Sequence, residues 1–504
     1  MVSTRVKFLI LLLPIFLFST TYYVSPDGDD NNSGLSPDSA FATLQHAADI
    51  VAAGDSVLVL NGEYVGFDLR TSGSVNSPIV FKTLGDSVII NQENSTTSDG
   101  VNIENADWII IDGFRVEGIP RAGIRVAVSQ HVTIRNNYCS YNGRWGIFTA
   151  FADYAVIENN ECSYSTDEHG IYFSNSADHP IIRKNICHHN RANGIHMNGD
   201  ESMGGDGLIT DARVEANIIY ENGTGGGSGI NCDGVAESVI FNNLLYMNHS
   251  SGISLYRIDA SAGSYHDKIF NNTIVNADDA RWCININTGS TGDTLYNNIL
   301  INLHPWRGSI SIDSSSTAGF FSDYNIVIDR LSNDGGNSII SLSQWQSLGY
   351  DLHSQLAASL DSIFVNWQNS DYHLCTGSQA IDTGTDLVAG VVLYDLDSIP
   401  RPQGSGFDIG AYEYQPVFVQ EDDFRASRPS TVIRTGEFII FSNLYSGDRV
   451  SIFDVSGRRC STSGRLNTGK WCWSTCGVPS GIYFYQISSD VSDEEERGKL
   501  VILK

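Results

Sequence analysis

Polar and aromatic side chains recur at equivalent positions in four short segments of this sequence, each of which begins with a Gly-Ile pair. The segments start at Gly170, Gly194, Gly229 and Gly252, and apolar and polar residues alternate within each one. Since the side chains of a β-strand point alternately to its two faces, each segment has one apolar and one polar face. Strands stacked in register would bring the polar side chains together, and we predict the functional site there. The polar set is Tyr172, Ser174, His196, Asn198, Asn231, Asp233, Ser254 and Tyr256.

His196 is the predicted general base of this surface. The alternation turns its imidazole outward, between Tyr172 on one strand and Asn231 on the next. Imidazole titrates near neutrality, and a lyase needs such a base to remove the proton alpha to a uronate carboxylate. A surface histidine in a polar ladder is the alternative interpretation.

Carboxylates gather next to this histidine. Asp233 lies one strand beyond Asn198, and Asp200 and Asp206 belong to the long loop that follows His196. Two carboxylates that converge on one sugar can hydrolyse a glycosidic bond, or they can hold a calcium ion that neutralises a uronate. Asp200, Asp206 and Asp233 are therefore the predicted calcium ligands, and separate solvated acids are the alternative.

Arginine and aromatic side chains complete the predicted site. Arg257 and Arg281 can each bind a carboxylate through two hydrogen bonds, or pair with the local acids Asp259 and Asp279. Tyrosine and tryptophan rings suit stacking on sugar rings, although they also pack within solenoids. The predicted catalytic residues are His196, Arg257, Asp233 and Tyr172, and the predicted substrate-binding residues are Asn198, Asn231, Tyr256, Arg281 and Trp282.

A repeat of about 25 residues positions these segments. An asparagine in a polar-Asn-x-aliphatic pattern recurs at Asn137, Asn160, Asn185, Asn217, Asn243, Asn272, Asn298 and Asn325. The repeat has no helical periodicity, and it lacks both the LxxLxL strands of a leucine-rich repeat and the 40-residue period of a propeller. We predict an all-β right-handed parallel β-helix in which aligned asparagines hydrogen-bond one coil to the next.

Two insertions lengthen the repeat beside the predicted site. Residues 199–211 follow His196 and Asn198, and residues 258–267 follow Tyr256 and Arg257. Insertions in solenoids form loops that often flank the binding face. Both leave the same strand column, which predicts a cleft.

Composition restricts the compartment and the partners. The 504 residues carry a net charge of −28, which argues against a nucleic-acid partner. Residues 1–20 combine basic residues with a short apolar run, as in a secretory signal peptide. Cys139, Cys162 and Cys187 occupy aliphatic positions of the repeat, so we expect buried thiols, although coil stacking would allow one disulfide.

The predicted domains follow from these patterns. Residues 21–414 form the β-helix with an N-terminal cap and a C-terminal closing segment that covers the exposed end of the core. A helix is expected within 41–53 and a strand over 56–60. Residues 415–429 are a polar linker, and residues 430–504 are predicted to form a small all-β sandwich.

The asparagine ladder and the Gly-Ile strands resemble the pectate-lyase-like right-handed β-helix superfamily. Residues 22–26 and 61–64 are similar to the start of family-nine pectate lyases and their relatives. That family carries a lysine base on a Gly-Phe-Lys-Leu strand, and the nearest match here is Gly194-Ile195-His196-Met197, with histidine in place of the lysine. Its paired-aspartate calcium signature is absent, and Asp167-Glu168 is the nearest counterpart. The resemblance implies the scaffold and a carbohydrate substrate.

The C-terminal residues resemble the sorting domain of the type IX secretion system. The matching positions are Asp454, Gly457-Arg458, Trp473, 480–485 and 498–504. The resemblance implies a partner in that secretion machinery and export across the outer membrane of a Gram-negative bacterium. The protein is then expected to be released or to remain attached at the surface.

The expected function is that of a secreted, monomeric polysaccharide lyase that cleaves a uronate glycan by β-elimination. In this hypothesis His196 is the base, Arg257 neutralises the carboxylate, and Asp233 with Asp206 holds calcium or substrate. One alternative is a glycoside hydrolase that uses Asp233 with Asp200, Asp206 or Glu168. The other is an adhesive β-helix that binds a glycan without turnover.

Overall fold

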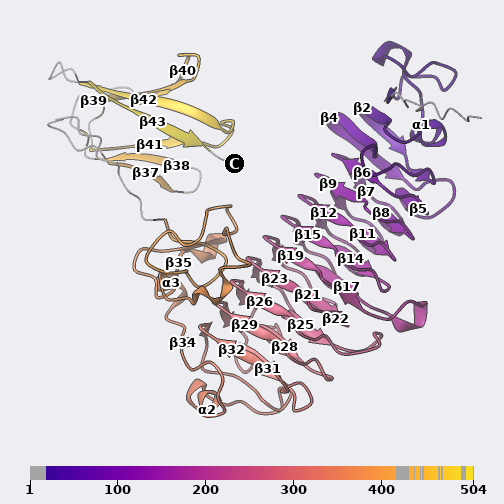
Figure 1. Cartoon of the computed structure of the whole chain (residues 1–504). Helices are drawn as coiled ribbons and strands as arrows, with labels where there is room; N and C mark the ends of the chain where they lie inside the picture. Colours follow the sequence, from indigo (N-terminus) through magenta and orange to yellow (C-terminus); the bar gives the residue numbers. More distant parts are fainter. Residues whose placement is uncertain are drawn as a thin grey trace, which may run out of the picture. The chain divides into compact units, whose positions relative to one another are not determined.

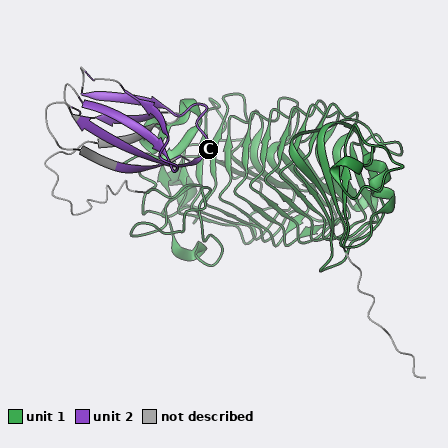
Figure 2. Ribbon diagram, turned by 90° about the horizontal axis from the view of Figure 1, so that it is seen from above, with its two compact units in different colours: residues 1–416 green, residues 417–504 purple. Residues whose placement is uncertain are grey.

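A computed structural model describes residues 19–415, 431–435, 438–442, 444, 448–463, 466, 469–489 and 495–502. Nearly all of the predicted signal peptide and of the predicted linker lies outside the described residues. The chain divides into two compact units, Met1–Pro416 and Val417–Lys504 (Figure 2).

The first unit is a solenoid whose coils stack three columns of short parallel strands (Figure 1). The first column is a ten-stranded parallel sheet that contains all four Gly-Ile segments. Its strands are β3 (Phe67–Leu69), β5 (Val101–Glu104), β8 (Ala122–Ala127), β11 (Trp145–Ala150), β14 (Ile171–Ser174), β17 (Ile195–Asn198), β21 (Ser228–Asp233), β25 (Ser251–Tyr256), β28 (Ile284–Ile286) and β31 (Ile310–Ile312).

The second and third columns are joined at the N-terminal end, because β4 (Ile79–Gln92) pairs with the first strand of each. Together with β1 (Thr21–Val24) and β2 (Ser56–Val65) they form one 22-stranded sheet. The second column is β6 (Ile109–Asp112), β9 (Thr133–Arg135), β12 (Val156–Glu158), β15 (Ile181–Arg183), β19 (Arg213–Glu215), β23 (Val239–Phe241), β26 (Lys268–Phe270), β29 (Thr294–Tyr296) and β32 (Phe321–Asp323). The third is β7 (Arg115–Glu117), β10 (Tyr138–Ser140), β13 (Glu161–Ser163), β16 (Ile186–His188), β20 (Ile218–Tyr220), β24 (Leu244–Tyr246), β27 (Thr273–Asn276), β30 (Ile299–Asn302), β33 (Ile326–Val327) and β34 (Gln355–Leu356).

The predicted asparagine ladder forms the corner between the second and third columns. Asn136 has φ 56° and turns the chain sharply, a left-handed conformation that asparagine tolerates. In the next coil, Asn160 Oδ1 accepts the backbone N–H of Asn137 at 3.0 Å, and Asn160 Nδ2 donates to the Ile134 carbonyl at 2.9 Å. The same bonds repeat through Asn217 and onward, so the ladder holds the register of the coils as predicted.

A second asparagine ladder follows the third column, and the sequence analysis did not predict it. Asn222 Oδ1 accepts the backbone N–H of Asn190 at 3.0 Å, and Asn248 Oδ1 accepts that of Asn222 at 3.1 Å. Its asparagines lie five residues after those of the first ladder, as in Asn185 and Asn190, but some coils have another residue there, such as Ser165, so the recurrence is less regular.

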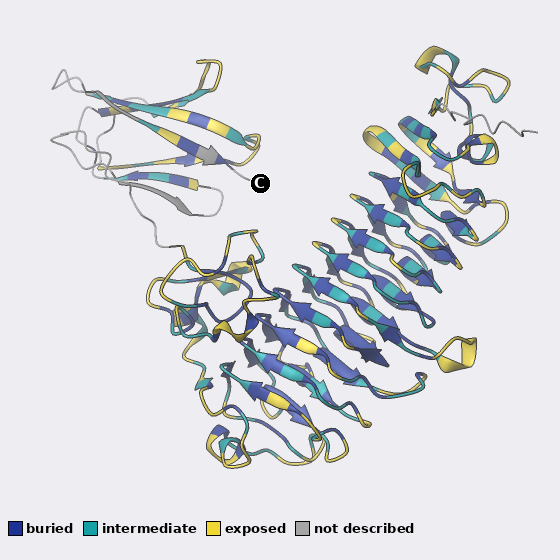
Figure 3. Ribbon diagram, in the orientation of Figure 1, coloured by how far each residue is buried: buried dark blue, intermediate teal, exposed yellow. Residues whose placement is uncertain are grey.

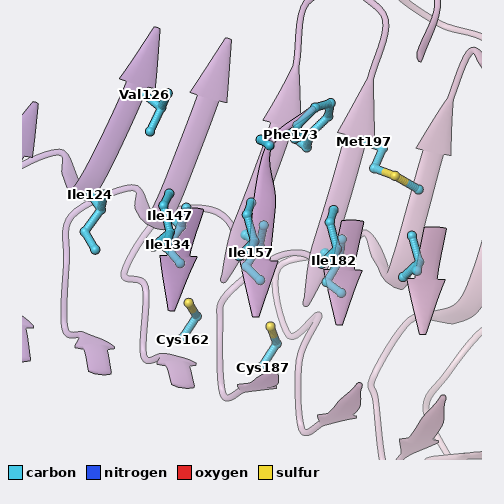
Figure 4. Close-up of a cluster of buried hydrophobic side chains, with 14 of the residues drawn as sticks. Ile124, Val126, Ile134, Ile147, Ile157, Cys162, Phe173, Ile182, Cys187 and Met197 are labelled. Carbon is cyan, nitrogen blue, oxygen red and sulfur yellow. The ribbon is translucent and has the colours of Figure 1, made fainter. Parts of the chain in front are cut away.

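The inward side chains fill a continuous core, as the alternation predicted (Figure 4). Ile147, Phe173 and Met197 are fully buried in it. Cys139, Cys162 and Cys187 pair in register on adjacent coils, are fully buried and are free thiols, which confirms their role as core residues. Burial raises the pKa of the Cys162 thiol well above its ordinary value.

The N-terminal cap contains the predicted helix and strand, with different limits. Helix α1 (Leu44–Ile50) is shorter than expected because Thr43 begins it, its side chain accepting the backbone N–H of His46. The strand β2 extends beyond the predicted 56–60 because it pairs with the long strand β4.

The closing segment covers more than the end of the core. Trp345 of helix α2 (Leu342–Gln346) is fully buried against the last coils, as a cap requires. Residues after α2 then return along the outside of the third column through α3 (Leu360–Ile363), β35 (Phe364–Asn366) and β36 (Asp371–Leu374). They cover the outward apolar side chains Leu244, Val275, Ile299, Ile301 and Ile326. These side chains would otherwise be exposed, which is the physical reason for the return.

The second unit contains two antiparallel sheets, in agreement with the predicted small all-β unit. One sheet consists of β37 (Thr431–Thr435), β38 (Phe438–Ser442) and β41 (Lys470–Ser474). The other consists of β40 (Arg459–Thr462), β39 (Asp448–Asp454), β42 (Gly481–Ser489) and β43 (Glu495–Ile502). Phe441, Trp473, Ile452 and Tyr483 come from both sheets and share one hydrophobic core. In the part of the chain that the structure describes, no helix is long and apolar enough to cross a membrane.

Candidate functional site

The outward residues of the first column align as the alternation predicted. Tyr172 pairs with His196, His196 with Asn231, and Asn231 with Ser254 on four consecutive coils. A second row joins Ser174, Asn198, Asp233 and Tyr256. The surface is nevertheless not open, since Tyr172, His196 and Tyr256 are half-buried and the other members are buried (Figure 3).

A chain of hydrogen bonds leads to His196 from the residues that precede the Gly-Ile pairs. The side-chain amide of Asn193 donates to His169 Nδ1 at 3.1 Å, and its backbone N–H approaches the same atom at 3.3 Å. His169 Nε2 lies 3.1 Å from His196 Nδ1. The Asn193 Oδ1 atom accepts the backbone N–H of Ser228, which fixes the orientation of the amide.

This network determines where the protons are. His169 Nδ1 faces two N–H donors and must be an acceptor, so His169 carries its proton on Nε2 and donates it to His196 Nδ1. Neutral His196 therefore carries its own proton on Nε2. Burial lowers the pKa of His196 to about 3, so the ring is neutral at physiological pH. Although His196 as a residue is half-buried, its Nε2 is covered and has no hydrogen-bond partner within the described structure.

Tyr172 lies directly against this imidazole. The two rings stack with centroids 4.9 Å apart and planes 16° apart. The Tyr172 hydroxyl accepts a hydrogen bond from Asn198 Nδ2 at 3.1 Å. Burial, together with the nearby charges of Asp200, Glu168 and Asp259, raises the pKa of Tyr172 to about 12. The phenol is protonated at neutral pH and is able to donate its proton.

Glu168 connects this pair to the preceding coil. Its carboxylate accepts hydrogen bonds from Trp145 Nε1 at 2.7 Å and from the Arg144 guanidinium, and it lies 3.7 Å from His169 Nε2. The Arg144 guanidinium covers the Trp145 ring, 4.5 Å from its centroid. An anionic group is thus held close to the histidine chain.

The next two coils continue the polar network. Asn231 Nδ2 donates to the Tyr256 hydroxyl at 2.7 Å. The Ser228 hydroxyl donates to Asn231 Oδ1 at 3.1 Å and to Ser254 Oγ at 2.8 Å. Asn231 and Tyr256, both predicted to bind substrate, therefore form one hydrogen-bonded group beside His196.

Asp233 does not have the role that its position suggested. Its carboxylate accepts the backbone N–H groups of Ile258, Asp259 and Ala260 at 2.8, 2.9 and 3.4 Å, and the residue is 1% exposed. It fixes the loop that follows β25, and its oxygen atoms are already engaged. We therefore assign it a positioning role in place of a catalytic one.

The three predicted calcium ligands do not form a metal site. Asp200 Oδ1 accepts the backbone N–H and the hydroxyl of Ser202, and Asp206 Oδ1 accepts the backbone N–H of Leu208. Asp233 is occupied by the loop after β25. Within the described residues, no three His, Cys, Asp or Glu side chains are arranged to hold a metal ion. The predicted donor set does not fit calcium, since these carboxylates bind backbone and hydroxyl groups.

The two insertions form a joined rim beside these residues. The Glu201 N–H donates to the Asp259 carbonyl at 2.9 Å, and the Ser261 hydroxyl donates to the Asp206 carbonyl at 2.6 Å. Asn198 Nδ2 lies 3.4 Å from Asp259 Oδ2, which brings this rim carboxylate next to the Tyr172 hydroxyl. Arg257 at the same rim is exposed, with its guanidinium 3.5 Å from the Ser261 carbonyl.

Arg281 and Trp282 lie away from the histidine pair. They precede β28, two coils beyond Asn231. Trp282 is 5% exposed and packs edge-on against Trp306, so its ring is unavailable for stacking on a sugar. Arg281 is exposed.

The structure thus brings together Tyr172, His196, Asn198, Asn231 and Tyr256, and leaves Arg281 and Trp282 apart. Sequence reasoning missed His169 and Asn193, and it named Glu168 only as a possible acid of the alternative glycoside hydrolase. A signal for the first two was present, because each stands directly before a Gly-Ile pair and therefore at the same level of successive coils.

Comparison with known proteins fixes the hand of the solenoid. Residues 79–205 match the family model described as "Right handed beta helix region". The fold is a right-handed parallel β-helix. An uncharacterised protein of Bacillus subtilis (strain 168), YwoF, is 30% identical over 130 residues, which cover 23% of this chain and 28% of that protein. The match thus spans less than a third of this curated relative.

Solved structures share the same scaffold. Pectate lyase Pel9A aligns with a TM-score of 0.55 and 18% identity, over 79% of this chain and 97% of that chain. An alginate lyase from Paenibacillus sp. str. FPU-7 aligns with a TM-score of 0.45 and 19% identity, over 55% of this chain and 96% of that chain. At this level of identity the likeness to Pel9A concerns the fold, and any activity must be argued from the residues of this chain.

Proposed function

We propose that the solenoid is a carbohydrate-active protein that binds a uronate-containing polysaccharide at the outer face of the first column and cleaves it by β-elimination. The observation that carries the proposal is the buried, unpartnered Nε2–H of His196 beside the protonated hydroxyl of Tyr172. A buried donor without a partner is unfavourable, and a substrate oxygen would satisfy it once the groups that cover the imidazole move aside. The scaffold shared with a pectate lyase is compatible with such a substrate.

The proposed chemistry assigns each group one task. The Asp259 carboxylate at the rim takes the proton alpha to the uronate carboxylate, and a carbon–carbon double bond forms as the bond to the glycosidic oxygen breaks. Tyr172 gives its proton to that leaving oxygen. The His196 Nε2–H and the exposed Arg257 stabilise the negative charge on the uronate carboxylate. In this proposal His196 is a hydrogen-bond donor and not the predicted general base, since its Nε2 already carries a proton.

The test is the rise of ultraviolet-absorbing unsaturated product from pectate, alginate and other uronate glycans, with and without added calcium. Tyr172→Phe removes the acid and is expected to lower the rate by roughly 10²–10⁴. His196→Gln, which retains an N–H donor, should keep more activity than His196→Ala. Tyr154→Phe, a change in an exposed tyrosine on another turn, is the matched control. If no uronate glycan yields unsaturated product, the proposal is wrong.

A second candidate is glycoside hydrolysis by Glu168 and Asp259. The observation that favours it is that both carboxylates raise the pKa of Tyr172, although they belong to different parts of the chain. New reducing ends without ultraviolet absorbance, lost in Glu168→Gln and in Asp259→Asn, would select this reaction. A glycan that binds and remains intact through long incubation would select the adhesive β-helix.

We further propose that the second unit directs export through the type IX secretion system, after which the β-helix acts outside the cell. The support is the sequence resemblance at Asp454, Gly457, Arg458 and Trp473, on a unit that has its own hydrophobic core. Deletion of residues 417–504 in a Gram-negative host with this system is expected to retain the protein in the periplasm. Secretion of the truncated chain to the medium would contradict the proposal.

A further inference from the structure

A cavity of about 370 Å³ lies outside the site described above, where the returning segment meets the ends of the third-column strands. One wall comes from the turns after β16, β20 and β24, and the other from residues 367–372. Its size is within the range of small-ligand sites. Neither the proposed reaction nor the predicted residues make use of it.

Aromatic groups form most of the wall. Tyr220 stacks between His188 and Tyr246, with ring centroids 4.7 and 4.8 Å apart, and Tyr246 continues to Tyr372 at 5.0 Å. Because these ring faces cover one another, their edges and hydroxyl groups line the cavity. Trp367 is half-buried, and its Nε1 donates to Asp361 Oδ1 at 2.9 Å, which fixes the indole at the opposite wall.

Uncharged hydrogen-bonding groups lie beside these rings. Gln368 Nε2 donates to Asp361 Oδ1 at 3.0 Å. Ser370 lines the same side. Burial raises the pKa of Tyr220 to about 12, so its phenol is protonated at neutral pH. Rings combined with donors and acceptors are typical of surfaces that bind sugars, which have apolar faces and hydroxyl edges.

The charge balance of the cavity favours a neutral sugar. Glu221 is the one acidic residue of the lining, and its Oε2 lies 3.0 Å from His249 Nε2. Burial lowers the pKa of His249, but hydrogen bonds to Asp279 and Glu221 outweigh it and raise that pKa above its ordinary value. The lining contains neither lysine nor arginine. A uronate would therefore meet the Glu221 carboxylate, and the nearby His249 is already paired with Glu221 and Asp279.

A strip of rings leads along the solenoid to this cavity. Tyr141 and Tyr164 stack with centroids 4.7 Å apart, and Tyr164 stacks on His189, a lining residue, at 4.9 Å. Tyr141 is 58% exposed, and in the coil before it the equivalent position is Gly118, where an added Cβ would meet open space. The outer face of the strip is therefore free to receive a further sugar ring.

We propose that this cavity, with the Tyr141–Tyr164–His189 strip, is an accessory binding site for a neutral saccharide chain. It would hold a neutral polysaccharide, or a neutral side branch, on a face of the β-helix separate from the first column. The inference is independent of the β-elimination proposed above, because it requires binding alone.

The test is binding of the full-length protein to neutral polysaccharides, namely xyloglucan, galactomannan, arabinan and mixed-linkage β-glucan, with pectate as the anionic comparison. Affinity gel electrophoresis identifies a ligand and titration calorimetry measures its affinity. Trp367→Ala is expected to weaken binding about tenfold, and Gln368→Ala about threefold through loss of one hydrogen bond. Trp367→Phe should retain most of the affinity.

Tyr154→Ala is the matched control, since Tyr154, like Tyr141 of the strip, is an exposed ring in a stacked ladder but lies on a different turn. If Trp367→Ala alters folding by circular dichroism, the exposed Gln368→Ala carries the test. The proposal is overturned if none of the neutral glycans binds, if pectate binds more tightly than all of them, or if both variants bind as the unmodified protein does. A negative result in the lyase assay leaves these outcomes unaffected.

Discussion

Two carboxylic acids are buried on adjacent coils at the start of β26 and β29. Asp267 and Asp293 are both 0% exposed. Asp293 Oδ1 accepts the backbone N–H of Asp267 at 2.9 Å, and Asp267 Oδ1 accepts that of Ser238 at 2.9 Å. The Oδ2 atoms of both residues are buried without a hydrogen-bond partner in the described structure. Each acid caps the turn of the preceding coil, and no ion pair with a cation is formed by either one among the residues that the structure describes.

Burial raises the pKa of both groups, to about 8 for Asp293, from an ordinary value of 3.8. Between these two values the folded protein binds more protons than the unfolded chain. The contribution of these two acids to the free energy of unfolding must therefore fall as the pH rises from about 4 to about 8. At roughly 1.4 kcal/mol per pKa unit, the loss due to Asp293 is on the order of 5 kcal/mol, a large share of the stability of an ordinary domain.

Asp293→Asn removes this titration while keeping the carbonyl that accepts the Asp267 N–H. We expect the variant to match the unmodified protein near pH 4 and to exceed its stability near pH 8. The measurement is the denaturant midpoint of the circular dichroism signal at several pH values between 4 and 8. The difference between variant and unmodified protein reports Asp293 together with its effect on the pKa of Asp267, because all other titrating groups are shared.

Glu237→Gln serves as the control, since Glu237 is exposed on the turn before β23. Its effect should be small and independent of pH. A variant Asp293→Asn that is less stable at pH 8, or a difference that does not change with pH, would refute the reasoning that these acids are uncompensated.

Three further outcomes are expected. Asn217→Ala removes the four side-chain hydrogen bonds of a fully buried asparagine and should lower the free energy of unfolding by roughly 3 kcal/mol, measured by denaturation. Hydrogen bonds to two aspartates raise the pKa of His373 to about 9, although burial opposes this shift. The stability that these hydrogen bonds supply is therefore present below about pH 6.5 and is lost as the pH rises through 9. His373→Gln should lower the melting temperature at pH 6 and have little effect at pH 10. Asp233→Asn should loosen the loop 257–262, seen as faster limited proteolysis there with little change in the global melting temperature.

Much of the architecture was predictable because its signals repeat. The aliphatic positions aligned with Cys139, the asparagine ladder and the Gly-Ile segments each recur once per coil, and hydrogen-bonded stacking converts a recurrence into a column. The alternation of side chains then predicts that Tyr172 lies next to His196, and the register of β14 and β17 confirms it.

The parts that were missed depend on contacts without a period. The hydrogen bonds that occupy the Asp233 carboxylate depend on the path of an irregular loop. The returning residues 360–414 cover outward apolar side chains such as Leu244 and Val275. Neither feature has a counterpart in neighbouring repeats, so the sequence contains no periodic signal that predicts it.

The sequence by itself determined the coil, its register and the row of side chains that contains Tyr172 and His196. Only the tertiary structure decided which nitrogen of His196 carries the proton, because that depends on Asn193 and His169 meeting it across coils. Periodicity specifies which face a residue occupies, whereas its protonation and its availability depend on every group that packs around it.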